Sequence, residues 1–400
     1  MESTCGIFDL PLEVLLMVFK EVKAEKDKLN LAQAHKVFGT AFAMDAGSTY
    51  RKIMFDERPI QEWKIILPLC GASVLRIVTK NVRTTVKVTK LASEFCPNLE
   101  EFFIPVRSHF WNHVTPVLST MKRLKWIGLT NNYERVKVVK TLRMLPNLRF
   151  LDLAKFSLPD MMALKELVDL ESISVVNGRK ESVDLYQMCS GMKNLNGIDM
   201  RYVDIRIPKE EQDTAVWPKM GFIRIGYGKF HTQMPFMPVL KYLTIESTHP
   251  TMKLNHILGT SVIKYENSLE YLRFCPETDR NLDKAGAVAL CHLKALKILE
   301  CRLENDEIIG SYIIQLKKLE HLNLQHSTKV TNYGVLLLLK HCKRLRKLNL
   351  FGCTNINRNL LGPATHILLR NGVRPDNPLV VQVGREFGAR PPNRVLQLPE

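Results

Sequence analysis

The chain has 400 residues, of which 46% are hydrophobic and 24% charged, and its formal net charge is +17 at pH 7. This composition excludes disorder over most of the chain, and no run of about 18 apolar residues predicts a membrane-spanning helix. Because a single core stops growing beyond roughly 250–300 residues, we expect two domains or an array of stacked repeats.

The nine cysteines and the first residues indicate a reducing compartment. An odd number of Cys does not suggest a disulfide framework. The opening MESTCGIFDLPLEVLL lacks the basic leader, apolar core and cleavage site of a secretory signal. We therefore expect a cytoplasmic or nuclear protein with reduced thiols. The positive charge favours anionic partners.

Residues 7–50 predict a small all-helical module. Pro11 suits a first helical turn, where its missing N–H costs little, and Asn30 is expected to cap a second helix that stops near Gly39. About 40 residues build little core, which favours docking to an external protein. The apolar residues at helical spacing are Leu10, Val14, Leu15, Val18, Phe19 and Val22.

The stretch FDLPLEVLLMVFKEV is similar to the opening of an F-box, whose pattern is Leu-Pro-x-Glu-hydrophobic-Leu followed by an apolar-Phe pair. The matching residues are Leu10, Pro11, Glu13, Val14, Leu15, Val18 and Phe19. LAQAHKVF stands where the later helix of that module lies, with Phe38 at its bulky aromatic position and Ala34-His35 in place of the common Val-Cys pair. The resemblance implies docking to a Skp-type linker protein through Leu10, Pro11, Val14, Leu15 and Phe19.

Residues 51–73 contain a dense apolar patch between Trp63 and Cys70. We expect a helical bridge here that caps the first edge of a repeat stack, since bare solenoid ends need such caps.

Residues 74–370 predict an array of repeats. The frame Leu-x-x-Leu-x-Leu begins at Leu319 and again 26 residues later at Leu345. Between them Thr331 is a plausible N-cap, and Val335, Leu338, Leu339 and Cys342 share one helical face. A strand, a turn, a helix and a segment that leads back to the next strand make one leucine-rich repeat. A single repeat cannot bury its apolar edge, so it must stack on its neighbours. Further starts fall at Leu296, Leu269, Leu240, Met220, Leu195, Leu170, Leu148, Leu124, Leu99 and, weakly, Val74.

A second marker supports this register. Three residues before each start the chain has a large apolar residue or Cys, except at Glu266 and Gly71. We therefore predict an α/β fold: a right-handed leucine-rich-repeat solenoid of about 11–12 repeats behind a small N-terminal all-helical F-box. Residues 371–400 are expected to form a closing strand, Leu379 to Val383, and a flexible tail beyond Arg385.

A helical module followed by such repeats resembles the substrate receptors of cullin–RING ubiquitin ligases, and Cys342 and Cys353 resemble the cysteines of a repeat subclass found in these receptors. The resemblance implies a non-catalytic chain. Its F-box would bind a Skp-type linker that is itself bound to a cullin–RING ligase, and its repeats would hold a substrate protein.

Alternate strand residues are expected on the concave face of the array. Several are aromatic residues interleaved with Arg, the types that dominate binding hot spots, and the arginines would also suit an anionic group. The candidate substrate-binding residues are Trp126, Phe150, Arg201, Phe222, Arg224, Tyr242, Tyr271, Arg273 and Arg302.

Enzyme and metal signatures are absent from the sequence. It contains no GxxxxGK, HExxH or GxSxG motif. A ligand set drawn from Cys291, His292, His341, Cys342 and Cys353 lacks the paired spacing of a zinc site. We therefore predict no catalytic residues, cofactor or metal.

Two alternatives stay open: a repeat scaffold without a ligase, and a nucleic-acid-binding protein that uses the cations preceding the strands. The same cations suit helix C-termini, so nucleic acid is the less favoured partner, and no membrane partner is expected. These cations are Lys122, Arg123, Lys193, Lys219, Lys294, Lys317, Lys318, Lys343 and Arg344.

Overall fold

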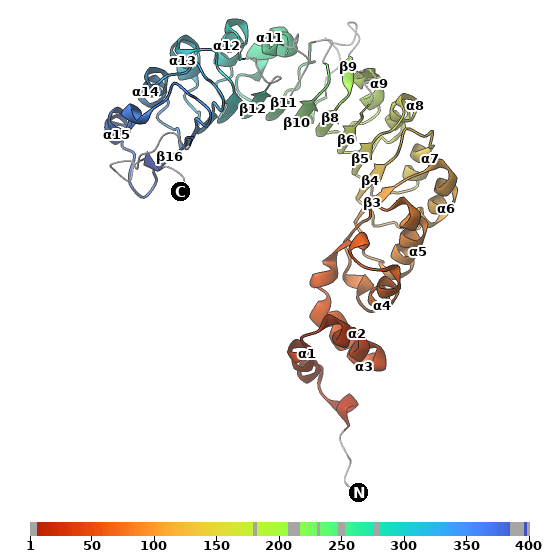
Figure 1. Ribbon diagram of the computed structural model, residues 1–400. Coiled ribbons are helices and arrows are strands. Elements are labelled where there is room, and N and C mark those ends of the chain that lie inside the picture. Colours follow the sequence, from red (N-terminus) through yellow and green to blue (C-terminus); the bar gives the residue numbers. More distant parts are fainter. Residues whose placement is uncertain are drawn as a thin grey trace. The chain divides into compact units, whose positions relative to one another are not determined.

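The computed structural model describes residues 6–178, 182–206, 217–229, 233–246, 253–275, 281–384 and 396–397 (Figure 1). The chain divides into two compact units, Met1–Ser174 and Val175–Glu400. In the described part of each unit, short parallel strands follow one another in one sheet and helices lie along one of its faces. The opposite face, here called the open face, is the predicted concave face.

The first unit begins with a helical module. It consists of a 3-10 turn η1 (Ile7–Asp9) and helices α1 (Leu12–Glu21), α2 (Glu25–Ala34) and α3 (Lys36–Ala46). Leu15, Phe19 and Phe42 are buried between these helices. The single helix predicted from Asn30 to Gly39 is wrong. His35 is extended (φ −158°) and its side chain accepts a hydrogen bond from the Val37 N–H, so α2 ends and α3 begins there.

The sheet of the first unit starts earlier than expected. Its strands pair in the order β1 to β6: β1 (Lys52–Met54), β2 (Arg76–Val78), β3 (Glu101–Pro105), β4 (Trp126–Thr130), β5 (Phe150–Ala154) and β6 (Ser172–Val176). The intervening helices are α4 (Ile60–Cys70), α5 (Thr85–Phe95), α6 (Ser108–Leu118), α7 (Val138–Leu142) and α8 (Leu158–Met162). The purely helical bridge predicted for 51–73 is therefore corrected. Buried Ile53 pairs with Ile77, which makes β1 the first strand.

The main sheet of the second unit contains β8 (Gly197–Arg201), β10 (Phe222–Gly226), β11 (Tyr242–Glu246), β12 (Tyr271–Cys275), β13 (Ile298–Cys301), β14 (His321–Asn323), β15 (Lys347–Asn349), β16 (Leu379–Gln382) and β17 (Leu396–Gln397). A separate two-stranded sheet pairs β7 (Ser182–Asp184) with β9 (Asp204–Arg206). The helices are α9 (Leu185–Cys189), α11 (Leu254–Leu258), α12 (Lys284–Cys291), α13 (Asp306–Ser311), α14 (Asn332–His341) and α15 (Leu361–Arg370).

The predicted repeat register is confirmed, because every frame start from Val74 to Leu345 lies two residues before a strand. The marker residue three positions earlier is fixed by a turn. For example, the Leu345 N–H donates to the Cys342 carbonyl at 3.0 Å and the Leu319 N–H to the Leu316 carbonyl at 3.1 Å. At Glu266 the register shifts by one residue, and buried Tyr265 fills the inward position instead.

The Leu319–Cys353 repeat has the predicted parts. Thr331 caps α14 by accepting a hydrogen bond from the Tyr333 N–H at 3.2 Å, and Val335, Leu338 and Leu339 are buried. Strand β16 lies where a closing strand is predicted, and β17 pairs with it. The predicted flexible tail otherwise lies outside the described residues. Among the helices of the described residues, none is long and apolar enough to cross a membrane.

Candidate functional site

The open face of the second unit carries a row of aromatic side chains. Phe222, Tyr242 and Tyr271 occupy the first positions of three neighbouring strands and are paired in register. The rings of Tyr242 and Tyr271 lie 6.1 Å apart, and Tyr242 is 47% exposed. These three predicted residues therefore come together as a row that faces solvent.

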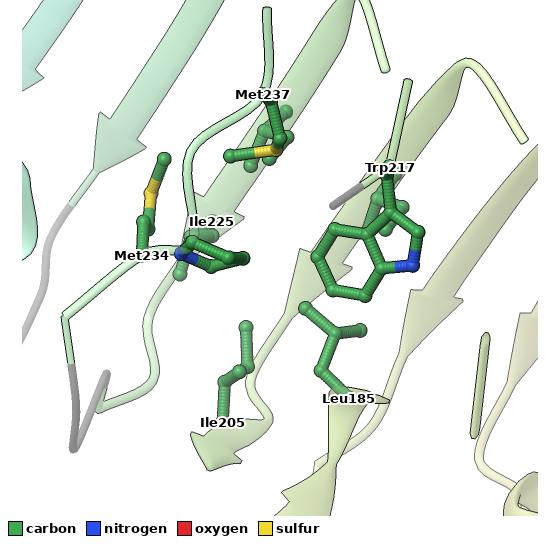
Figure 2. Close-up of a pocket in the computed structure, with 9 residues that line it drawn as sticks. Leu185, Ile205, Trp217, Ile225, Met234 and Met237 are labelled. Atoms are coloured by element: carbon green, nitrogen blue, oxygen red, sulfur yellow. The ribbon is translucent and has the colours of Figure 1, made fainter. Parts of the chain in front are cut away.

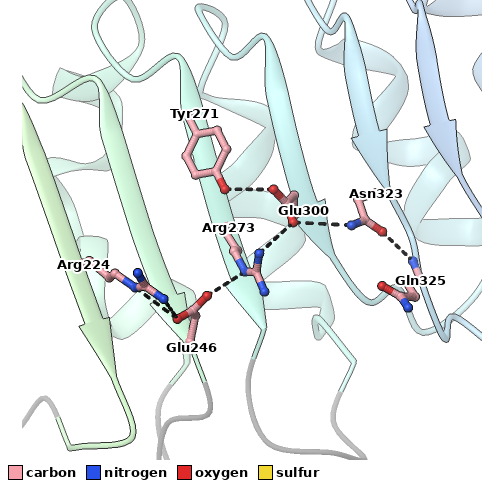
Figure 3. A network of polar contacts seen from close by, with 7 residues as sticks. All are labelled: Arg224, Glu246, Tyr271, Arg273, Glu300, Asn323 and Gln325. Atoms are coloured by element: carbon pink, nitrogen blue, oxygen red, sulfur yellow. Dashed lines mark hydrogen bonds and ion pairs between the residues drawn. The ribbon is translucent and has the colours of Figure 1, made fainter. Parts of the chain in front are cut away.

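A network of charged groups lies on the same face, closer to the ends of the strands (Figure 3). The Arg224 guanidinium donates twice to one carboxylate oxygen of Glu246, at 2.7 and 3.2 Å. The other oxygen of Glu246 lies 3.0 Å from Arg273 Nε, and Arg273 Nη1 lies 3.3 Å from Glu300. Glu300 also accepts hydrogen bonds from the Tyr271 hydroxyl at 2.8 Å and from Asn323 Nδ2 at 3.4 Å.

This network changes the role expected for the arginines. Arg224 and Arg273 are neutralised by Glu246 and Glu300, and Arg201 forms an ion pair with Asp199 at 3.1 Å. Burial raises the pKa of Asp199 above its usual range, although the cations beside it act in the opposite direction. These three arginines are thus engaged by carboxylates in the chain itself, and their suitability for an anionic group stays a prediction.

The last predicted arginine, Arg302, follows strand β13 and is half-buried. It is one residue beyond the strand, whereas Arg224 and Arg273 both lie in the register of Thr244, and Arg201 pairs with Gly226 at the ends of their strands.

Burial and the Glu300 carboxylate together raise the pKa of Tyr271 to about 12. The phenol therefore stays protonated and keeps donating its hydrogen bond over the physiological range. The aromatic row and the charge network are thus joined through one side chain.

A second aromatic cluster lies on the open face of the first unit. Trp126 and Phe150, both predicted, pair in register with their rings 5.7 Å apart. Phe103 joins them at 5.5 Å from Trp126, and Arg76 lies over the Phe103 ring at 4.5 Å. Sequence reasoning missed Phe103 because it occupies a different strand position. Its signal was mid-strand Gly128 on the neighbouring strand, where a Cβ would lie 2.1 Å from the Phe103 ring.

Sequence reasoning also missed a stacked pair of tyrosines. Tyr202 and Tyr227 directly follow β8 and β10, and both adopt positive φ angles, 60° and 58°. Their rings lie 4.5 Å apart and almost parallel, and both are exposed. This pair extends the aromatic surface towards the ends of the strands.

The predicted docking residues in and before α1 divide into buried and solvent-accessible side chains. Leu15 and Phe19 are 0% exposed, and the Phe19 ring packs 5.9 Å from that of Phe42. The prediction that these two side chains contact a partner is therefore corrected, because they form the core of the module. Pro11 and Val14 are exposed, and Leu10 is half-buried.

Beside these residues, Met17 is 66% exposed, and with Pro11 and Val14 it follows the three-residue spacing of one helix face. We call Pro11, Val14 and Met17 the outer row of α1. Two exposed side chains of η1, Ile7 and Phe8, add apolar surface nearby in the chain.

The described residues also contain a small, partly open cavity in the second unit (Figure 2). Its volume is about 10 Å³, and Trp217, Met234 and Met237 contribute to an entirely apolar lining. A cavity of this size and character is at the lower limit for a single water molecule and offers it no partner. It is a packing defect and not a ligand site.

Two of the cysteines considered as metal ligands, Cys342 and Cys353, are buried and have structural roles. The Cys353 thiol donates to the Leu324 carbonyl at 3.1 Å, and burial raises the pKa of both Cys342 and Cys353 to about 11. Thiols that stay protonated and buried behave as small hydrophobic groups.

No family model matches the chain, and no curated protein matches it. Among solved structures, an internalin from Listeria monocytogenes str. 4b F2365 aligns with a TM-score of 0.42 at 12% identity, covering 84% of this chain and 87% of that one. The Rad7 and Elc1 complex in yeast contains a chain that aligns with a TM-score of 0.43 at 13% identity, covering 96% of this chain and 94% of that one. Both scores are below 0.5, so the fold assignment rests on the strand register described above.

Proposed function

We propose that this chain is the substrate-recognition subunit of a Skp–cullin–F-box ubiquitin ligase. Its N-terminal module docks on a Skp-type linker protein, and its repeats hold a substrate protein. The chain itself performs no bond chemistry. It accelerates ubiquitin transfer by holding the substrate near the ubiquitin-charged enzyme, which raises the effective concentration of the reacting groups.

The observation that carries this proposal is the outer row of α1. A module of three short helices uses Leu15 and Phe19 for its own core, yet leaves Val14 and Met17 in solvent on the same helix. A partner could bury the remaining exposed area of both, 38% of Val14 and 66% of Met17, at roughly 25 cal/mol per Å² of apolar surface. The match between this segment and the F-box pattern, including Leu10 and Pro11, supports a Skp-type linker as that partner.

The open faces support the second half of the proposal. The Phe222, Tyr242 and Tyr271 row offers apolar and hydroxyl groups side by side, and the neighbouring charges are balanced and pre-oriented. Aromatic residues surrounded by ordered polar groups are typical of protein-binding hot spots. A folded or extended protein segment is thus the ligand class that this face suits.

The test is a binding assay between the full chain and a purified Skp-type linker protein. Val14→Asp with Met17→Asp should abolish binding, because each new carboxylate would have to lose its water in the interface. Both positions are exposed, so circular dichroism should show an unchanged fold. Val288→Asp is the matched control, since Val288 is an exposed apolar residue on α12, within the repeats. If the wild-type chain does not bind the linker, the ligase proposal is wrong. The hypothesis of a repeat scaffold without a ligase is then favoured.

A further inference from the structure

The positive charge of this protein is concentrated in its last repeats. Residues 316–375 contain eleven Lys or Arg residues against one carboxylate, Glu320, which leaves a net charge of +10 out of the +17 of the whole chain. In earlier repeats of the second unit, by contrast, arginines are matched by carboxylates, as in the network around Glu246 and Glu300.

Most of these cations lie along one edge of the repeats, where helices end and strands begin. Lys317 and Lys318 precede β14, and Lys343 and Arg344 precede β15 at the equivalent positions. Arg370 ends α15, and Arg374 lies in the turn that follows it. We call these six exposed residues the basic edge.

Within the described part of the chain, no carboxylate lies within ion-pair distance of any basic-edge side chain. Parallel strands place equivalent residues of neighbouring repeats about 4.8 Å apart, so the cations of successive turns reinforce one another. The helix dipoles account for only part of this charge, because each helix C-terminus presents about half a negative charge.

The open face of these repeats carries a row of side-chain amides. Asn323, Asn349 and Gln382 are aligned in register on β14, β15 and β16. The Asn349 Oδ1 atom accepts a hydrogen bond from the Phe351 N–H. Asn323 is more fully engaged, because its Nδ2 donates to Glu300 and its Oδ1 accepts from the Gln325 N–H. Side-chain amides at strand spacing are suited to the amides of an extended peptide.

The aromatic residues of these repeats argue against single-stranded nucleic acid, whose bases stack on exposed rings beside the cations. The exposed rings here belong to Tyr333, at the start of α14, and Phe351, after β15. Both positions lie at the edge opposite to the basic edge. On the same sheet face, the register of Tyr242 and Tyr271 instead leads through Ile298 to His321 and Lys347.

We infer that the basic edge binds an acidic polypeptide segment of the substrate protein, whose backbone can reach the amides of Asn349 and Gln382. The inference rests on the proposed function only in that the repeats hold a protein, and it does not depend on docking by α1. It specifies a charge pattern, a run of Asp or Glu, that the substrate must carry.

The test uses the full chain and three labelled probes: a 20-residue peptide of alternating Glu and Ser, the same peptide with Gln for Glu, and a 20-base-pair DNA duplex. We expect the Glu peptide to bind, the Gln peptide not to bind, and the affinity to fall as NaCl is raised. Lys343→Ala with Arg344→Ala should weaken binding about five-fold.

The matched control is Lys329→Ala with Arg358→Ala. It removes the same charge from two exposed residues of the same repeats that lie at the opposite edge, and it should change the affinity less than two-fold. Equal weakening by both double variants, or no binding of the Glu peptide, would overturn the inference. Tighter binding of the DNA duplex than of the peptide would also overturn it, in favour of a nucleic-acid surface. Neither result would affect binding of the linker protein by α1.

Discussion

Phe19 and Met17 lie two residues apart on α1, but the first is completely buried and the second is 66% exposed. The sequence could not separate them, because Leu12, Val14, Leu15 and Leu16 make this helix apolar on nearly every side. A match to the F-box pattern identifies the segment by its residue types. It does not show which of these side chains are buried in the module's own core. That distinction required the positions of α3 and of Phe42.

Phe19→Ala should therefore act on stability. Removing the buried ring leaves a cavity beside Phe42 and should lower the free energy of unfolding of the helical module by about 3–5 kcal/mol. Thermal unfolding of the chain, monitored through the hydrogen exchange of backbone amides in α1 and α3, would measure this loss of stability. Met17→Ala is the control and should change stability by less than about 0.5 kcal/mol. Similar losses in both variants would contradict the assignment of Phe19 to the core.

At the scale of elements, the strands could be predicted because their frame leucines recur with the same local geometry: every frame start except Leu269 makes a turn hydrogen bond to the residue three positions earlier, as Leu345 does to Cys342. That local geometry repeats even where the helices shrink to five residues, as in α7 and α8. Strand β1 escaped prediction because it offers only Ile53 as an inward residue. The charge network escaped it because its partners lie 22 to 27 residues apart and meet only after the strands stack.

Glu300→Gln tests the network that links β12, β13 and β14. Burial is the larger cause of the raised pKa of Tyr271 and the Glu300 carboxylate the next, so this change should lower that pKa only part of the way from about 12 towards 10. Chemical shifts of Tyr271 in labelled protein, assigned with Tyr271→Phe, would follow the titration.

The same shift makes stability depend on pH. The pKa of Tyr271 is higher in the folded state than in the unfolded state. The protonated phenol therefore contributes fully to the free energy of unfolding below pH 10, and this contribution is lost as pH rises from 10 to about 12. Glu300→Gln should make this loss smaller. Glu304→Gln is the control, since Glu304 is exposed and lies just beyond β13. An unchanged Tyr271 titration in Glu300→Gln would show that the hydrogen bond does not form in solution.

At the scale of the whole molecule, the net charge of +17 is known from composition alone, but its effect depends on where the repeats place it. Equivalent positions such as Lys317 and Lys343 fall on one edge, so cations distant in sequence repel one another in the folded state.

Raising NaCl from 0.01 M to 0.15 M shortens the screening length from about 30 Å to about 8 Å. Amide exchange in α14 and α15 should therefore slow as salt is added, while exchange in α5 and α6 should change little. Lys343→Ala with Arg344→Ala should reduce the salt effect by relieving the repulsion. Equal salt effects on both pairs of helices would mean that salt acts on the chain in general, and that the edge charges are too well solvated to destabilise the last repeats.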